Sequence, residues 1–221
     1  MSQRADASVV IPAAGSGERL GLGPKAFLAM SGVTLLERVA QTALRVADQV
    51  VVAVPADRLD EARALCQGCT CIAGGATRQE TVAKLVQACD RPWILVHDVA
   101  RPFASEALLR SVLDAARETG AAGACLNPDV PAVRLGANGA ILECFEPSGI
   151  GVFQAPQAFS RELLLGVLAR AEREGWRKQT TLQLILKAGL RAKAVKGERA
   201  NIKITHEQDW LQAMYLMRSK S

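Results

Sequence analysis

Glycines and two basic residues follow the first apolar segment of the chain. Residues 9–25 read VVIPAAGSGERLGLGPK, in which Arg19 and Lys25 carry the positive charge. The apolar start suits a buried strand, and glycines let the backbone bend and approach a ligand with its N–H groups exposed. Successive exposed N–H groups bind anions, and the two cations add charge. The segment therefore predicts a strand that ends in a polyphosphate-binding loop.

Two better-known phosphate-binding motifs do not fit this loop. A P-loop needs GxxxxGK followed by Ser or Thr, and a dinucleotide-binding loop needs a third glycine after Gly15 and Gly17. These requirements argue against a P-loop ATPase and a nicotinamide-dependent dehydrogenase. The remaining alternative is that the two glycines only form a tight turn between a strand and a helix.

Five motifs in one order carry a family resemblance. Residues 12–25 resemble the signature loop of sugar-nucleotide and polyol-phosphate nucleotidyltransferases. They are followed by GGATRQ (74–79), VHDVARPF (96–103), QAPQ (154–157) and NIKIT (201–205). Together these motifs resemble the 2-C-methyl-D-erythritol 4-phosphate cytidylyltransferase family, over nearly the whole chain. The resemblance implies cytidylyl transfer from CTP to that polyol phosphate, with release of pyrophosphate, in the non-mevalonate synthesis of isoprenoid precursors.

The same resemblance implies roles for individual residues. Arg19, Lys25 and Lys203 are expected to contact the triphosphate and stabilise the transition state. The region of Gly74, Gly75 and Thr81 is where the family binds cytosine and ribose, although a plain turn also explains the glycines. The expected nucleotide-binding residues are Pro12, Ala13, Ala14, Gly15, Gly17, Gly74, Gly75, Thr81 and Ala100.

Nucleotidyl transfer needs little covalent chemistry from the protein. A phosphate oxygen of the acceptor attacks the α-phosphorus while pyrophosphate leaves, so negative charge builds on phosphate oxygens. Positioning and electrostatic stabilisation then dominate catalysis. Because the attacking phosphate is already ionised near neutral pH, no strong general base is required, which suits a chain with two histidines. Mg²⁺ or another divalent cation is the expected cofactor.

Asp98 is the candidate for the metal ligand and for positioning the acceptor. The alternative for this residue is to cap a helix, which Asp often does after a strand. Arg101 either pairs with Asp98 or contacts the ligand. If their loops converge, five basic residues can form one cation cluster for small anionic substrates: Arg19, Lys25, Arg78, Arg101 and Lys203.

Departures from the family concentrate on the acceptor side. Where the family carries an Asp-Thr pair, an arginine and the threonine of a Thr-Pro-Gln motif, this chain has residues 131–132 (Pro-Ala), Pro147 and Ala155. Residues 179–183 (QTTLQ) replace an expected Thr-Asp-Asp segment. Arg134 or Lys178 is therefore predicted to supply charge for the acceptor phosphate. The alternatives are another polyol phosphate as acceptor, or a nucleotide-binding homodimer without acceptor chemistry.

Short apolar runs alternate with helical patterns through the first 126 residues. Strands are predicted at 9–11, 50–54, 93–96 and 121–126, with helices at 57–66, 77–88, 105–118 and after a capping box at Thr34. Residues 190–195 predict a further strand, and a capping box at Thr205 a final helix. This alternation predicts one α/β domain over residues 1–221, with a doubly wound, mostly parallel, Rossmann-like sheet.

Residues 127–153 interrupt this alternation with prolines and glycines. The segment predicts an inserted, protruding β-arm. In the resembled family such an arm embraces a second subunit, which implies a homodimer with acceptor sites completed across the interface.

Composition limits the other classes of partner. The net charge is +5, but the cations are scattered and aromatic residues make up 4% of the chain, so nucleic acid is not an expected partner. No apolar run approaches the roughly 18 residues of a membrane span, and no export signal is evident, so a cytoplasmic location is expected. The six cysteines, including the pair Cys66 and Cys69, are expected to be free buried thiols rather than a zinc site or a redox pair.

Overall fold

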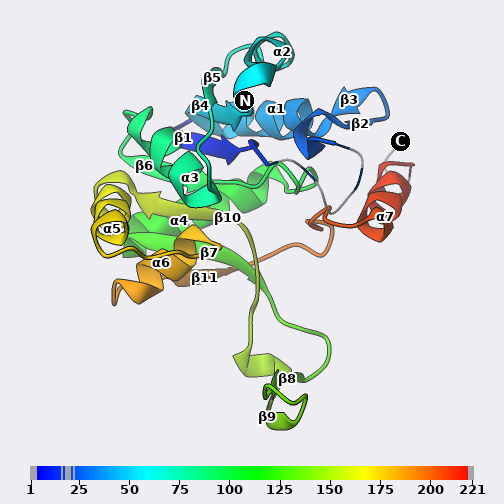
Figure 1. The fold of residues 1–221 in the computed structure, drawn as a ribbon, viewed down its shortest axis with the longest axis vertical. Helices are drawn as coiled ribbons and strands as arrows, with labels where there is room; N and C mark the ends of the chain where they lie inside the picture. Colours follow the sequence, from blue (N-terminus) through cyan, green and yellow to red (C-terminus); the bar gives the residue numbers. More distant parts are fainter. Residues whose placement is uncertain (1–3, 16, 18–20, 22, 219–221) are drawn as a thin grey trace.

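A computed structural model describes residues 4–15, 17, 21 and 23–218 of the chain. Within that part, a seven-stranded sheet lies at the centre, with helices on both faces (Figure 1). The strand order is β11-β7-β10-β6-β1-β4-β5. The strands are β1 (Ala5–Pro12), β4 (Ala47–Val54), β5 (Thr70–Ala73), β6 (Trp93–Val96), β7 (Ala121–Leu126), β10 (Val152–Ser160) and β11 (Lys193–Lys196).

The sheet is parallel except for β10, which runs antiparallel to both β6 and β7. The predicted doubly wound α/β fold is confirmed. β5 and β10 are additions to the predicted strands. β10 follows the arm and returns through the middle of the sheet, where its side chains are buried between β6 and β7.

Helices cover the two faces in separate groups because alternate strand residues face opposite sides. Val9 and Ile11 of β1 belong to one apolar core, and Val10 belongs to the other. The first core is covered by α1 (Leu35–Val46), α2 (Leu59–Leu65), α4 (Glu106–Thr119) and α7 (Glu207–Arg218). The second is covered by α3 (Arg78–Gln87), α5 (Arg161–Arg173) and α6 (Thr181–Lys187).

Short elements complete the described chain. A small sheet pairs β2 (Ala29–Met30) with β3 (Val33–Thr34), and 3-10 turns occupy η2 (Lys25–Phe27), η3 (Ala56–Arg58) and η4 (Pro147–Gly149). No described helix has the length and apolar character that crossing a membrane would require.

Local capping fixes where several helices begin. Thr34 forms the predicted capping box with Glu37 at the start of α1. The predicted box at Thr205 is wrong, because α7 begins later, at Glu207. The carboxylate of Asp209 accepts the backbone N–H groups of Thr205 and His206, each at 2.8 Å. The carboxylate of Asp209 thus accepts the N–H of Thr205, which the side chain of Gln208 would have accepted in the predicted box.

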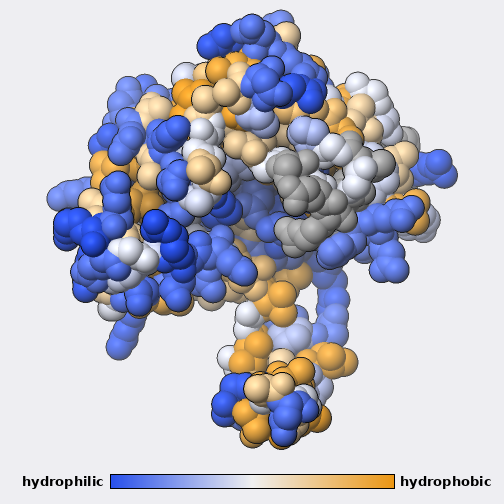
Figure 2. All heavy atoms as spheres, in the orientation of Figure 1, coloured by the Kyte–Doolittle hydropathy of each residue, from blue (hydrophilic) through white to orange (hydrophobic). Residues whose placement is uncertain are grey.

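The arm is a β-hairpin that protrudes from the sheet (Figure 1). It contains β8 (Ala132–Leu135) and β9 (Ile141–Phe145), within the predicted segment 127–153. Apolar side chains lie on its surface, as the orange spheres at the bottom of Figure 2 show. The exposed large apolar residues of this region are Val130, Val133, Leu135, Ile141, Leu142 and Val152.

Candidate active site

Two adjacent hollows open beyond the carboxyl ends of β1, β5 and β6, where open α/β sheets bind ligands. The first, of about 220 Å³, is lined by Pro12, Ala14, Gly15, Gly75, Ala76, Thr77, Arg78 and Thr81. The second, of about 180 Å³, is lined by Pro12, Ala13, Gly15, Gly17, Lys25, Ala26, Arg78, Asp98, Val99, Ala100 and Lys203. The fold therefore brings most of the predicted site residues together. Arg19 lies outside the described residues.

Close packing explains the glycine that follows β5. A Cβ atom at Gly74 would overlap the Cβ of Ala14 in the signature loop, while the N–H of Gly74 donates to the carbonyl of Val54 at 2.9 Å. Glycine at this position lets the two loops that line the first hollow lie directly against each other.

The buried hydroxyl of Thr81 holds the next glycine. It accepts the backbone N–H of Gly75 at 3.0 Å and donates to the carbonyl of Thr77 at 2.9 Å. Thr77 caps α3, whose first turn thus forms one wall of the hollow. Thr81 lines the hollow but directs its polar atom into this loop, and nucleotide binding by Thr81 stays a prediction.

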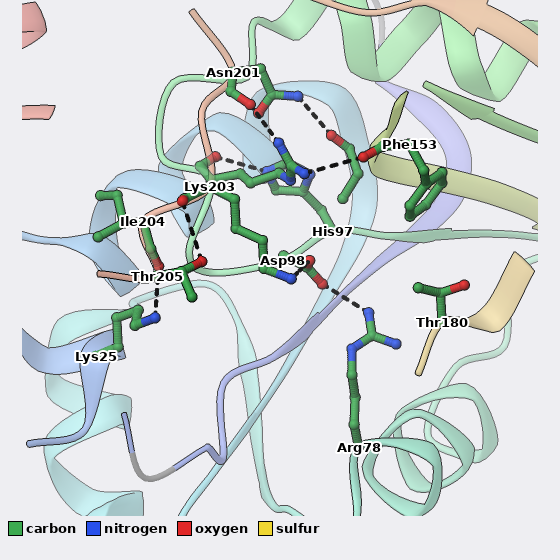
Figure 3. Close-up of polar contacts among 12 residues, drawn as sticks. Lys25, Arg78, His97, Asp98, Phe153, Thr180, Asn201, Lys203, Ile204 and Thr205 are labelled. Carbon is green, nitrogen blue, oxygen red and sulfur yellow. Dashed lines mark hydrogen bonds and ion pairs between the residues drawn. The ribbon is translucent and has the colours of Figure 1, made fainter. Parts of the chain in front are cut away.

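Three cations of the second hollow come from distant parts of the chain. Asp98 follows β6 and forms ion pairs with Arg78 at 2.8 Å and with Lys203 at 3.1 Å, one through each carboxylate oxygen (Figure 3). The ammonium group of Lys25 donates to the carbonyl of Ile204 at 2.6 Å. Two positive charges thus flank a single carboxylate, and Lys25 adds a third positive charge to the lining of the same hollow.

The protonation state of Asp98 is set by the two basic side chains beside it. Burial acts to raise the pKa of this carboxyl group, but the positive charges of Arg78 and Lys203 outweigh it and hold the pKa well below its usual range. The carboxylate is therefore ionised at neutral pH. It positions the guanidinium and ammonium groups at the edge of the hollow and leaves a net positive site for phosphate.

The described residues include no group of three His, Cys, Asp or Glu side chains placed to hold a metal ion. Asp98 is the one acidic side chain among the described residues that line the second hollow. This donor set suits Mg²⁺ of the kind that binds through one carboxylate and takes its other ligands from substrate phosphates and water. A zinc site needs three or four protein ligands, which is more than the single carboxylate among the described residues of this hollow supplies.

Arg101 holds its loop through backbone carbonyls rather than through an ion pair with Asp98, and contact with the ligand stays a prediction. Its buried guanidinium donates to the carbonyls of Asn201 at 2.6 Å and Phe153 at 3.4 Å. Burial lowers the pKa of Arg101, and its backbone carbonyl contacts the Nε2 of buried His97 at 3.0 Å. Arg101 thus joins the loop after β6 to the segment that carries Lys203 and to the base of the arm.

Two amides complete this scaffold. The Nδ2 of Asn201 donates to the carbonyl of Ala155 at 2.7 Å, and the Nε2 of Gln154 donates to the carbonyl of Glu198 at 3.0 Å. Both residues belong to motifs recognised in the sequence, but the sequence predicted no function for either one. Their contacts align residues 198–204 along β10 and so position Lys203.

The two predicted substitute cations do not line either hollow in the described chain. Arg134 lies on the arm and pairs with Glu143 across the hairpin at 3.0 Å. Lys178 is exposed before α6, and its backbone N–H donates to Gln79 at 3.3 Å. The hairpin that carries Arg134 extends away from the sheet (Figure 1), and a role of Arg134 or Lys178 in acceptor binding stays a prediction.

Comparisons with known proteins agree with this geometry. The family model for 2-C-methyl-D-erythritol 4-phosphate cytidylyltransferase (IspD) matches residues 7–219. A protein of that name from Thermus thermophilus is 42% identical over 96% of this chain and 98% of its own length. The one from Deinococcus radiodurans is 39% identical over 91% of this chain and 85% of its own length.

Solved structures show the same fold. The crystal structure of the Thermus thermophilus cytidylyltransferase has a TM-score of 0.81 at 37% identity and covers 96% of this chain and 98% of its own. The structure of 4-diphosphocytidyl-2C-methyl-D-erythritol synthase from Anaerococcus prevotii has a TM-score of 0.87 at 24% identity, with 96% coverage of each chain. This chain therefore belongs to the 2-C-methyl-D-erythritol 4-phosphate cytidylyltransferase family.

Proposed function

We propose that this chain transfers a cytidylyl group from CTP to 2-C-methyl-D-erythritol 4-phosphate and releases pyrophosphate, a step in the synthesis of isoprenoid precursors. Family membership supports this choice of substrates. The observation that carries the proposal is the cation-lined hollow, where Lys25, Arg78 and Lys203 meet the glycine-rich signature loop.

The geometry suits an in-line displacement. An oxygen of the acceptor phosphate attacks the α-phosphorus of CTP, and the bond from that phosphorus to the bridging oxygen of pyrophosphate breaks. Lys25 and Lys203 stabilise the charge that develops on the phosphate oxygens, together with backbone N–H groups of the signature loop. Because the acceptor phosphate is already ionised, no side chain has to remove a proton from it.

Mg²⁺, or another divalent cation, is proposed to enter with the phosphates of CTP. Asp98 is the protein carboxylate available to it in the described hollow. When bound, the ion supplies charge neutralisation on the triphosphate. Asp98 would hold the ion in place of one of its two ion pairs, and Arg78 or Lys203 would then be available to phosphate.

The direct test is a steady-state assay of pyrophosphate release. We expect turnover with CTP, Mg²⁺ and 2-C-methyl-D-erythritol 4-phosphate, and little with ATP, GTP or UTP. Inactivity with this acceptor combined with turnover of another polyol phosphate would move the assignment to that acceptor. CTP binding in calorimetry without turnover of any acceptor would support a nucleotide-binding homodimer instead.

Asp98→Asn is expected to raise the Mg²⁺ concentration for half-maximal rate, or the KM for the acceptor, by about tenfold or more, since charged hydrogen bonds contribute about 1.5–3 kcal/mol. The substitution removes the charge but little of the shape. Titrations of Mg²⁺ and of acceptor measure the effect, and Asp114→Asn, at an exposed position of α4, is the matched control. Unchanged kinetics for both ligands would assign Asp98 to organising the loop alone.

The arm is proposed to join two copies of the chain. Its large apolar side chains are exposed to solvent in the single chain, and an apolar patch of this kind is typical of an interaction surface. In a symmetric dimer the arm of one copy would bring Arg134 to its partner. The cytoplasmic location expected from the sequence stays a prediction.

A further inference from the structure

Three thiols lie together where α2 passes into β5. Cys66 ends α2 and is buried in the first apolar core, while Cys69 and Cys71 are half-buried and pack against the same core. All three are free thiols. The grouping lies at the start of the edge strand β5, and none of the three lines either hollow in the described chain. The proposed transfer reaction does not use these thiols.

The backbone holds Cys66 and Cys69 at a distance suited to a disulfide. The N–H of Cys69 donates to the carbonyl of Cys66 at 3.0 Å, which closes a four-residue turn. Gly68 makes this turn possible with a φ of +86°, a value that favours glycine. Such turns keep their end Cα atoms within about 7 Å, and disulfides join Cα atoms about 4.4–6.8 Å apart. Both side chains face the same core, so their sulfurs lie on one side of the turn.

The two thiols differ in access and in acidity. Cys69 is half-exposed and Cys66 is buried. A hydrogen bond between the two thiols, followed by burial, raises the pKa of Cys66, and the same hydrogen bond lowers the pKa of Cys69. Cys69 is therefore the thiol that ionises and meets a reagent first, and Cys66 is the thiol that can follow.

We propose that Cys66 and Cys69 form a reversible dithiol–disulfide pair whose oxidant is a small, water-soluble disulfide. The Cys69 thiolate attacks one sulfur of that disulfide, the S–S bond breaks, and one small thiolate leaves. Cys66 then loses its proton to water and attacks the Cys69 sulfur, which releases the second small thiolate. Two electrons pass from the protein to the small disulfide, which becomes two thiols.

The strand β5 connects the cysteine pair to the loop that contains Gly74. The turn leads directly into β5, whose last residue precedes Gly74. Gly74 packs against Ala14 with no room for a side chain, so β5 links the pair to a close contact beside the first hollow. The pair itself is independent of the proposed reaction, and its chemistry is tested without substrates.

The test equilibrates the folded full-length protein with defined ratios of oxidised to reduced glutathione, followed by alkylation of free thiols and peptide mass spectrometry. We expect a Cys66–Cys69 disulfide that forms at high ratios, reverses with excess reduced glutathione, and leaves the circular dichroism spectrum unchanged. Cys71→Ala is the matched control and is expected to retain the disulfide.

Two variants separate the steps. Cys69→Ala is expected to abolish the disulfide, and Cys66→Ala is expected to stop at glutathione bound to Cys69. A native protein that keeps both thiols at every ratio would overturn the proposal. A disulfide between Cys69 and Cys71, or one that appears only after unfolding, would overturn it as well. Because no nucleotide is present, failure of the proposed transferase activity leaves these outcomes unchanged.

Discussion

Replacement of Lys25 by alanine is expected to lower kcat for pyrophosphate release by several hundred-fold, with little change in the midpoint of thermal unfolding. The ammonium group lines the second hollow from η2 and is held by the carbonyl of Ile204 at 2.6 Å. A preorganised group that stabilises charge in the transition state contributes about 3–4 kcal/mol, which corresponds to that range of rate.

Lys193→Ala on β11 is the matched control, because this lysine is exposed and does not line the site. Pre-steady-state measurement of the chemical step separates lost catalysis from weaker CTP binding. Near-normal kcat in Lys25→Ala would show that the loop is only architectural. The sequence predicts the same loss for Arg19→Ala, a position outside the described residues.

Paired charges on the arm are expected to separate the proposed homodimer. Leu135 and Ile141 are 61% and 69% exposed and lie opposite each other in the hairpin. Leu135→Glu with Ile141→Lys removes their apolar surface and places opposite charges side by side, which preserves the hairpin. Each buried aliphatic side chain contributes about 1.5–3 kcal/mol, so the dimer dissociation constant should rise at least about a hundredfold.

Light scattering after size-exclusion chromatography measures the mass, and the acceptor KM is expected to rise in the monomeric variant if the partner completes the acceptor site. Leu186→Lys on α6 is the control, since this leucine is also exposed but lies outside the arm. A parent protein that is already monomeric, or a double variant that remains dimeric, would contradict the role proposed for the arm.

The sequence alone determined the features whose signals are local. Continuous apolar runs marked β1, β4, β6 and β7, because strands buried on both faces need apolar side chains on both sides. The capping box located the start of α1, because Thr34 and Glu37 lie three residues apart and need no distant part of the chain to interact. Prolines and glycines marked the arm, and the order of the motifs identified the family.

Only the tertiary structure decided how the site is assembled. Asp98 meets Arg78 and Lys203, which are far apart along the chain, because parallel strands end at one edge of the sheet. One expectation was that Arg101 pairs with Asp98, yet its guanidinium donates to the carbonyls of Asn201 and Phe153. These contacts depend on which loops lie next to each other, and that is set by the order of the strands in the sheet. The types of residue along the chain do not give this order.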